Sequence, residues 1–254
     1  LTIIPVYYLC KKFFDEKIAI IGAAIFVLEP RIIQNSILGI TESLFIFLGV
    51  ISLSLFLSNN KKMIYISFVI AGLFALVRYE GLLLIIPLVI IFTVRFRKEK
   101  KFYLKIFFAV LIFVLVLLPM AHIRSETIGN DGLVNHIAAG TLFYQSVAEG
   151  NDNEHIIFEM MLKGFYSYVM YFGWVAIPIF FLIVPYGFFK IIKNRDTKNW
   201  MLIITGIILS VPAFYVYSRD IQETRYLYVL YPLLCVISLY TIDPIFNKFK
   251  NKKL

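Results

Sequence analysis

The chain alternates between long apolar runs and short charged clusters from one end to the other. Most of the runs are about 15–20 residues long, close to the length of α-helix that crosses the hydrocarbon core of a bilayer. They cover residues 1–10, 18–28, 43–57, 63–77, 82–94, 102–120, 166–189, 200–217 and 226–242. We therefore expect an all-α, polytopic transmembrane helix bundle with about nine spans, formed by residues 1–254 as a single domain.

Composition excludes the other broad classes of protein. The chain is 60% hydrophobic and only 16% charged, with a mean hydropathy of +0.83, so it lacks the charged coat of a soluble domain. The net charge of +9 does not indicate nucleic-acid binding, because the basic residues gather at the ends of the apolar runs. Cys10 and Cys235 lie within apolar runs without metal-ligand spacing, as buried small residues would.

Lysine and arginine follow alternate apolar runs, which predicts the orientation in the membrane. Of the 25 basic residues, 18 lie in clusters on one predicted side, in residues 11–17, 61–62, 95–101, 190–198 and 248–253. The positive-inside rule makes this side cytoplasmic. The C-terminus is then cytoplasmic, and the remaining polar chemistry, including 11 of the 16 acidic residues, lies on the outer face.

A polar island separates the apolar runs 18–28 and 43–57. It begins at Glu29, includes Arg31 and ends at Glu42. Charged groups at the mouth of a membrane bundle are costly unless they bind or react with something. The island is therefore a candidate wall of an active site, and the alternative is an ordinary polar turn between two helices.

Two further outer turns pair arginine with carboxylates. Arg78 and Glu80 lie in a four-residue turn between two spans, and Arg219, Glu223 and Arg225 lie in the turn before the last span. A guanidinium matches the geometry of a phosphate group with paired donors, so either turn could hold an anionic lipid head. The structural alternatives are an ion pair within the first turn and a snorkelling anchor at the second.

The outer loop 122–165 is the only sizeable one. Helical spacing with mixed polarity over Leu133–Ala148 and His155–Lys163 predicts amphipathic helices lying on the membrane surface. Between them, residues 151–155 read Asn-Asp-Asn-Glu-His. These side chains could bind a divalent metal, although such acidic clusters are usually solvated turns. No other cofactor is expected.

Several motifs, taken in order, resemble a known family. They are Tyr8–Phe14 with the following Ile18–Pro30, Thr41–Phe45, Arg78–Leu84, and Arg225–Leu227 with the later Pro232. In this order they are similar to the GT-C class of multi-pass membrane glycosyltransferases, in the branch of protein O-mannosyltransferases and aminoarabinose transferases. Arg78–Leu84 departs from the family's Arg-Pro-Glu-Gly-Leu turn by placing Tyr79 where the family has proline.

The resemblance implies transfer of a sugar from a polyprenyl-phosphate donor to a glycan, lipid or protein acceptor on the non-cytoplasmic face. It implies a supporting acidic role for Glu42. The implied ligands of the donor phosphate are Arg78, Arg225 and Arg219, and the implied lining of the acceptor side is Glu29, Arg31, Glu80 and Glu223. The family keeps its general base in the first outer loop, and the chain begins with Leu1 inside an apolar run. We therefore expect the main catalytic acid to lie upstream of Leu1.

Three other functions remain open from the sequence. A polymerase or ligase of lipid-linked polysaccharide would use the same class of substrate. A transporter or flippase would have internal repeats and helices broken near the midplane of the membrane. A non-catalytic membrane subunit is the third alternative. In every case the lipid bilayer is the expected partner and nucleic acid is not.

Overall fold

The computed structural model describes residues 1–129, 132, 134–149, 155–177, 180–194 and 196–251. Within these residues every regular element is helical, so the all-α prediction is confirmed. The first half contains α1 (Ile3–Cys10), α2 (Glu16–Val27), α3 (Pro30–Ile37), α4 (Glu42–Phe56), α5 (Lys61–Val77), the 3₁₀ helix η1 (Tyr79–Leu84), α6 (Ile85–Phe96) and α7 (Phe102–Ile128). The second half contains α8 (Val134–Glu149), α9 (His155–Ala176), α10 (Phe180–Lys193), α11 (Thr197–Ser218), the 3₁₀ helix η2 (Thr224–Leu230) and α12 (Tyr231–Asn251).

The described residues contain fewer candidate membrane spans than the expected nine. Among the described residues, four helices are long and apolar enough to cross a membrane: η1 with α6, α7, α11, and η2 with α12. Two bent pairs, α2 with α3 at 58° and α9 with α10 at 108°, raise the number to six if each is one span. The nine-span prediction is therefore not confirmed.

Helix length explains part of the difference, because the predicted runs coincide with helical segments but several of these segments are short. The helix α1 has 8 residues, α4 has 15 and α5 has 17. At a rise of about 1.5 Å per residue, α4 extends roughly 22 Å, against a hydrocarbon core of about 30 Å. Apolar composition alone did not reveal that these helices fall short.

The polar island forms a short helix of its own. Pro30 occupies the first turn of α3, where a missing backbone N–H costs nothing. Glu29 precedes it in an extended conformation, with φ −74° and ψ 113°. The chain therefore turns sharply between α2 and α3 at Glu29, and α4 begins at Glu42 after a second break.

The outer loop is more helical than expected. The helix α8 coincides with most of the helix predicted over 133–148, and α9 begins at His155 as predicted. Their predicted place on the membrane surface stays a prediction. However, α9 continues to Ala176 and so absorbs the first part of the predicted span 166–189. The rest of that run forms α10, which is bent from α9 by 108°.

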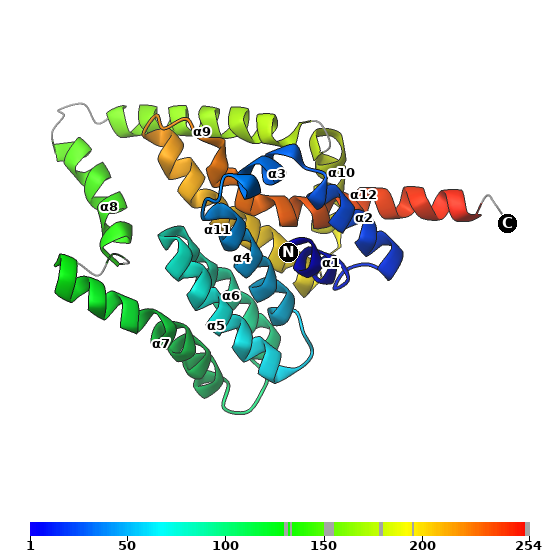
Figure 1. The fold of residues 1–254 in the computed structure, drawn as a ribbon, viewed down its shortest axis with the longest axis horizontal. Coiled ribbons are helices and arrows are strands. Elements are labelled where there is room, and N and C mark those ends of the chain that lie inside the picture. Colours follow the sequence, from blue (N-terminus) through cyan, green and yellow to red (C-terminus); the bar gives the residue numbers. More distant parts are fainter. Residues whose placement is uncertain (130–131, 133, 150–154, 178–179, 195, 252–254) are drawn as a thin grey trace.

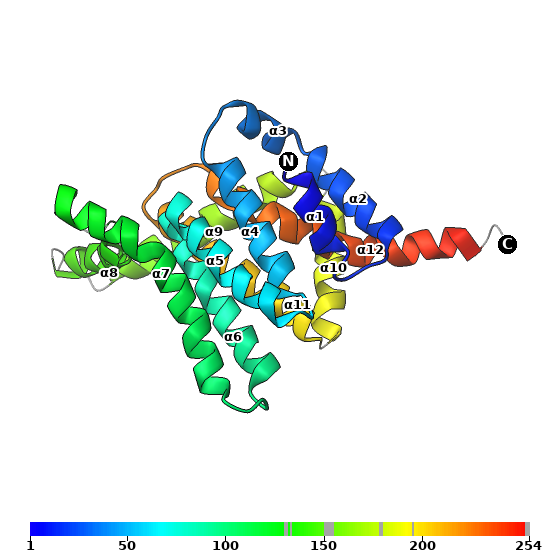
Figure 2. The same ribbon diagram turned by 60° about the horizontal axis from the view of Figure 1, so that its bottom comes forward.

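The first part of α12 lies in the middle of the molecule, and its C-terminal part projects beyond the other helices (Figure 1). Its neighbours are α10 and α2, whereas α4, α5 and α7 pack side by side in sequence order (Figures 1 and 2). The helix α9 lies along α11, and α8 connects this side of the molecule to the end of α7 (Figure 1). A side chain at Gly187 of α10 would collide with the Ile237 carbonyl of α12, so this pair needs glycine to approach closely.

Candidate active site

Four helix ends meet at one place on the molecule. Glu42 is the first residue of α4, Arg78 follows the last residue of α5, and Glu80 lies in η1. Arg225 lies in η2, which packs against α4 and α11. Each charged residue thus stands where an apolar helix begins or ends, so the polar ends gather while the helix bodies bury their apolar faces.

Arg78 joins two buried carboxylates. Its Nη1 lies 2.5 Å from Glu42 Oε1, and its Nη2 lies 2.7 Å from Glu80 Oε1. The side chains of Arg78, Glu42 and Glu80 are 15%, 4% and 8% exposed. Burial disfavours the charge on Arg78, but the carboxylates of Glu80 and Glu42 outweigh it and raise the pKa of Arg78 above its ordinary value. Arg78 is therefore a fixed cation.

Aromatic rings complete the surroundings of Arg78. Its guanidinium carbon lies 5.8 Å from the centre of the Phe45 ring and 5.3 Å from that of Tyr226. Arginine over an aromatic face is held by cation–π attraction as well as by hydrogen bonds. The rings of Phe45 and Tyr226 therefore hold the faces of the guanidinium, while the carboxylates bind the N–H groups at its edge.

Arg225 approaches the same carboxylate from η2. Its Nη1 lies 3.9 Å from Glu42 Oε1, and its Nε forms a short ion pair with Glu223. The other oxygen of Glu42, Oε2, is buried and has no hydrogen-bond partner among the described residues. Glu42 thus has one oxygen shared by two guanidiniums and one oxygen with its acceptor capacity unused, and a buried acceptor of this kind is costly.

A cavity of 310 Å³ opens beside Arg78. Its polar lining comes from Arg78, Glu80, Tyr226 and Arg124, and Gly132 contributes backbone. Arg124 was not among the site residues expected from the sequence. It lies in the predicted outer loop 122–165, apart from the basic clusters that the positive-inside rule explains, and that position was the available signal.

Arg219 has different partners from those expected. Its guanidinium carbon lies 4.5 Å from the ring centre of Phe143, and its Nη1 donates to Tyr215 Oη over 3.2 Å. Its neighbour Asp220 pairs with Lys163 at 3.0 Å, which lowers the pKa of Asp220. Within the described part of the chain, no ion pair joins Arg219 to the carboxylates near Arg78, so its role at a donor phosphate stays a prediction.

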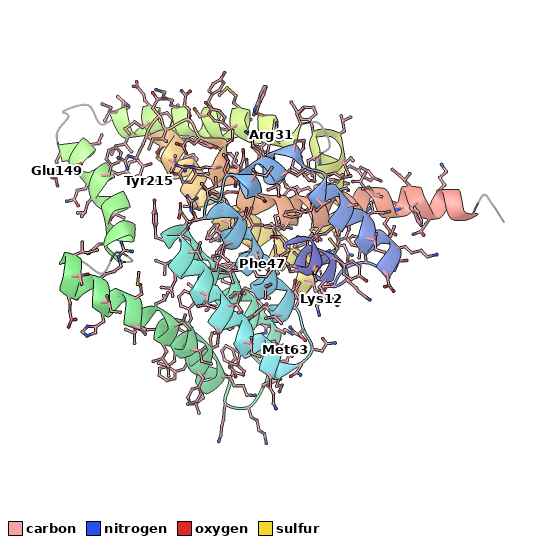
Figure 3. All side chains as sticks on the ribbon, viewed as in Figure 1. Lys12, Arg31, Phe47, Met63, Glu149 and Tyr215 are labelled. Atoms are coloured by element: carbon pink, nitrogen blue, oxygen red, sulfur yellow. The ribbon has the colours of Figure 1, made fainter. Side chains whose placement is uncertain are left out.

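Glu29 and Arg31 form a second, separate buried cluster. Glu29 is 1% exposed and pairs with Arg31 at 3.0 Å. Arg31 also donates to the carbonyls of Trp174 and Ile177, each over 3.0 Å, at the end of α9. Figure 3 labels Arg31 on the side of the molecule where α3 approaches α9. The last carbonyls of a helix lack partners within it and attract positive charge, so Arg31 caps α9.

The predicted metal segment lies largely outside the described residues, which resume at His155. Across the residues whose placement is described, no group of three or more His, Cys, Asp and Glu side chains could hold a metal ion. Cys10 and Cys235 are buried and free, as expected. A divalent metal therefore stays a prediction.

Residues 1–122 match the model of a family described as dolichyl-phosphate-mannose-protein mannosyltransferase. The matched part runs from α1 into α7 and contains Glu29, Arg31, Glu42, Arg78 and Glu80, whereas the other site residues lie beyond it. The resemblance inferred from the sequence is confirmed over this part of the chain. No curated protein and no solved structure matches. The family match and the apolar helices together indicate an integral membrane protein related to glycosyltransferases.

Proposed function

We propose that the protein transfers a sugar from a polyprenyl-phosphate donor to an acceptor on the non-cytoplasmic face of a membrane. The observation that carries the proposal is the meeting of Glu42 and Glu80 with Arg78 and Arg225 beside a cavity of 310 Å³. Fixed cations next to carboxylates suit a reaction in which one substrate is a phosphate ester and the other a hydroxyl.

In this reaction the acceptor oxygen forms a bond to the anomeric carbon of the sugar, and the bond from that carbon to the phosphate oxygen breaks. Polyprenyl phosphate leaves with the bonding electrons, so negative charge grows on its phosphate in the transition state. Preorganised cations at that position stabilise this charge without reorganisation. Arg78 and Arg225 are assigned to this role.

Glu42 is assigned to the acceptor. Arg78 and Arg225 hold its Oε1, while its Oε2 has no partner among the described residues. That oxygen is buried, so an acceptor hydroxyl reaches it only when the side chains around Glu42 move; the hydroxyl can then donate a hydrogen bond to it and be oriented. The proton of the hydroxyl passes to a general base, and the proposal assigns that role to no residue of this chain.

The family description adds a preference for the sugar. It names mannose carried on dolichyl phosphate and a protein acceptor. The match covers fewer than half of the residues, so we extend to this protein the class of donor, a polyprenyl-phosphate sugar, and take mannose as the first sugar to test.

The break between α2 and α3 favours a second candidate, a transporter of lipid-linked sugar, because transporters use broken helices to bind their cargo. The charged side chains at this break already have partners, however. Glu29 is neutralised by Arg31, and Arg31 is directed to the carbonyls of α9. A cargo would have to displace these contacts, which supports transfer over transport.

The test is a transfer assay in membranes that carry the protein, supplied with polyprenyl-phosphate mannose labelled in the sugar. We expect label in the acceptor and release of polyprenyl phosphate. Loss of one preorganised donor at a developing anion costs about 10²–10³ in rate, so Arg225→Ala should fall in this range, and Glu42→Gln should also be impaired.

The matched control is Asp220→Asn, because the Asp220–Lys163 pair is exposed and shares no ion pair with Arg78, Glu42 or Glu80 within the described residues. This variant should keep the wild-type rate. The proposal is wrong if Glu42→Gln and Arg225→Ala both transfer normally. It is also wrong if the labelled donor crosses the membrane intact without any transfer.

A further inference from the structure

The two arginines beside Glu42 are already paired with carboxylates. Arg78 contacts Glu42 and Glu80, and Arg225 contacts Glu42 and Glu223. Three carboxylates thus face two guanidiniums, which leaves the cluster with one surplus negative charge. A phosphate bound beside Arg78 therefore needs a further positive charge to offset this surplus in a medium of low dielectric.

Arg124 supplies the missing positive charge. It stands near the end of α7 and lines the same cavity as Arg78, Glu80 and Tyr226. Among the described residues, no hydrogen bond or ion pair occupies its guanidinium. Its donors are therefore available to a ligand, whereas those of Arg78 are directed to carboxylates.

Gly132 leaves room for this guanidinium. The residue has φ +66°, and a Cβ built on it would come closer to Arg124 Cζ than real atoms allow. A side chain at this position would push the guanidinium out of its place beside the cavity. The backbone at Gly132 therefore lies closer to the guanidinium of Arg124 than a residue with a Cβ would allow.

We propose that Arg124 is the main phosphate anchor of the site and that it binds the phosphate of a polyprenyl-phosphate substrate in the cavity it shares with Arg78. Arg78, which lines the same cavity, then acts on the bound phosphate with its orientation set by Glu42 and Glu80. This inference rests on the proposed function and names the residue that holds the substrate. The required ligand is a phosphate monoester or diester with an apolar chain.

The test measures binding rather than transfer. Purified protein in nanodiscs is titrated with polyprenyl phosphate, with the polyprenol that lacks the phosphate, and with inorganic phosphate. A hydrogen bond to a charged group contributes enough to change affinity by about tenfold to a hundredfold. We expect Arg124→Ala to weaken binding of polyprenyl phosphate by this factor and to leave polyprenol binding unchanged.

Three further variants distinguish the specific loss of phosphate binding by Arg124 from a general loss of structure. Arg124→Lys keeps the charge without the fork of donors and should lose less affinity than Arg124→Ala. Gly132→Ala should weaken binding in the wild-type background but add no further loss to Arg124→Ala, because both changes remove the same contact. Arg97→Ala, an exposed arginine at the far end of α6, is the matched control and should bind normally.

Each outcome supports or refutes the assignment of Arg124 as the phosphate anchor. If Arg124→Ala binds polyprenyl phosphate as tightly as the wild type while Arg225→Ala does not, the anchor is wrongly assigned and the proposed transfer still stands. If the wild type binds polyprenol as tightly as polyprenyl phosphate, no phosphate site exists, and both this inference and the proposed donor fall. If the effects of Gly132→Ala and Arg124→Ala simply add, the two residues act independently and the shared contact is refuted.

Discussion

Arg78 is the single cation between two buried carboxylates, and its removal should have a different effect on each of them. In Arg78→Met, Glu42 keeps the approach of Arg225 at 3.9 Å. Glu80 keeps no ion pair within the described part of the chain, although its side chain is only 8% exposed. Removing one partner of a buried ion pair strands the other charge, which costs about 3–5 kcal/mol in the free energy of unfolding.

The decisive measurement is the change in the free energy of unfolding that Glu80→Gln causes in the wild type and in Arg78→Met. In the wild type, this change removes charge-assisted hydrogen bonds from Arg78 and should destabilise the protein by about 1.5–3 kcal/mol. In Arg78→Met, the same change removes a stranded charge and should stabilise the protein. The sign of the effect of Glu80→Gln should therefore reverse between the backgrounds, which additive contributions cannot produce.

The assay is equilibrium unfolding in mixed micelles with increasing SDS, followed by far-ultraviolet circular dichroism, for the wild type, the two single variants and the double variant. Arg97→Met serves as the control, since a surface substitution is usually within about 0.5 kcal/mol of the wild type. The reasoning is refuted if Arg78→Met lies within about 1 kcal/mol of the wild type. It is refuted equally if Glu80→Gln destabilises both backgrounds by the same amount.

Two further variants probe the packing that positions the site. Arg31→Met should free the end of α9 from α3 and destabilise the protein by about 2–4 kcal/mol. It should also raise amide hydrogen exchange in the last turn of α9. Unchanged exchange in that turn would contradict the role of Arg31 as a cap. Gly187→Leu should force α10 away from the Ile237 carbonyl of α12, at a cost of about 1–3 kcal/mol; the matched change Gly173→Leu, where a Cβ would meet nothing within 4 Å, should be tolerated in the same unfolding assay.

Hydropathy predicted the positions of the helices but not their lengths. Each apolar run corresponds to a helix, because burial of apolar side chains and pairing of every backbone group leave few alternatives in lipid. Hydropathy did not predict the short lengths of α4 and α5, because helix ends depend on local backbone geometry and on contacts with distant helices. The expected count of spans therefore exceeded the observed one.

The candidate site was predicted in part. The distribution of lysine and arginine predicted that Glu42, Arg78 and Arg225 lie on the same face of the membrane, and the structure brings these three into contact. Arg31 was expected beside them, yet it contacts carbonyls that lie 143 and 146 residues further along the chain. Contacts over such separations leave no local pattern in a single sequence. Arg124 was missed because its significance depends on which neighbours are already neutralised.

The cap formed by Arg31 on α9 also has a consequence for the order in which the protein is made. Arg31 is synthesised 146 residues before Ile177, whose carbonyl it binds. Until α9 has been made, Arg31 therefore lacks the carbonyls of Trp174 and Ile177 as acceptors. The elbow between α2 and α3 can settle only after α9 has been inserted, so the two halves of the protein complete their assembly together.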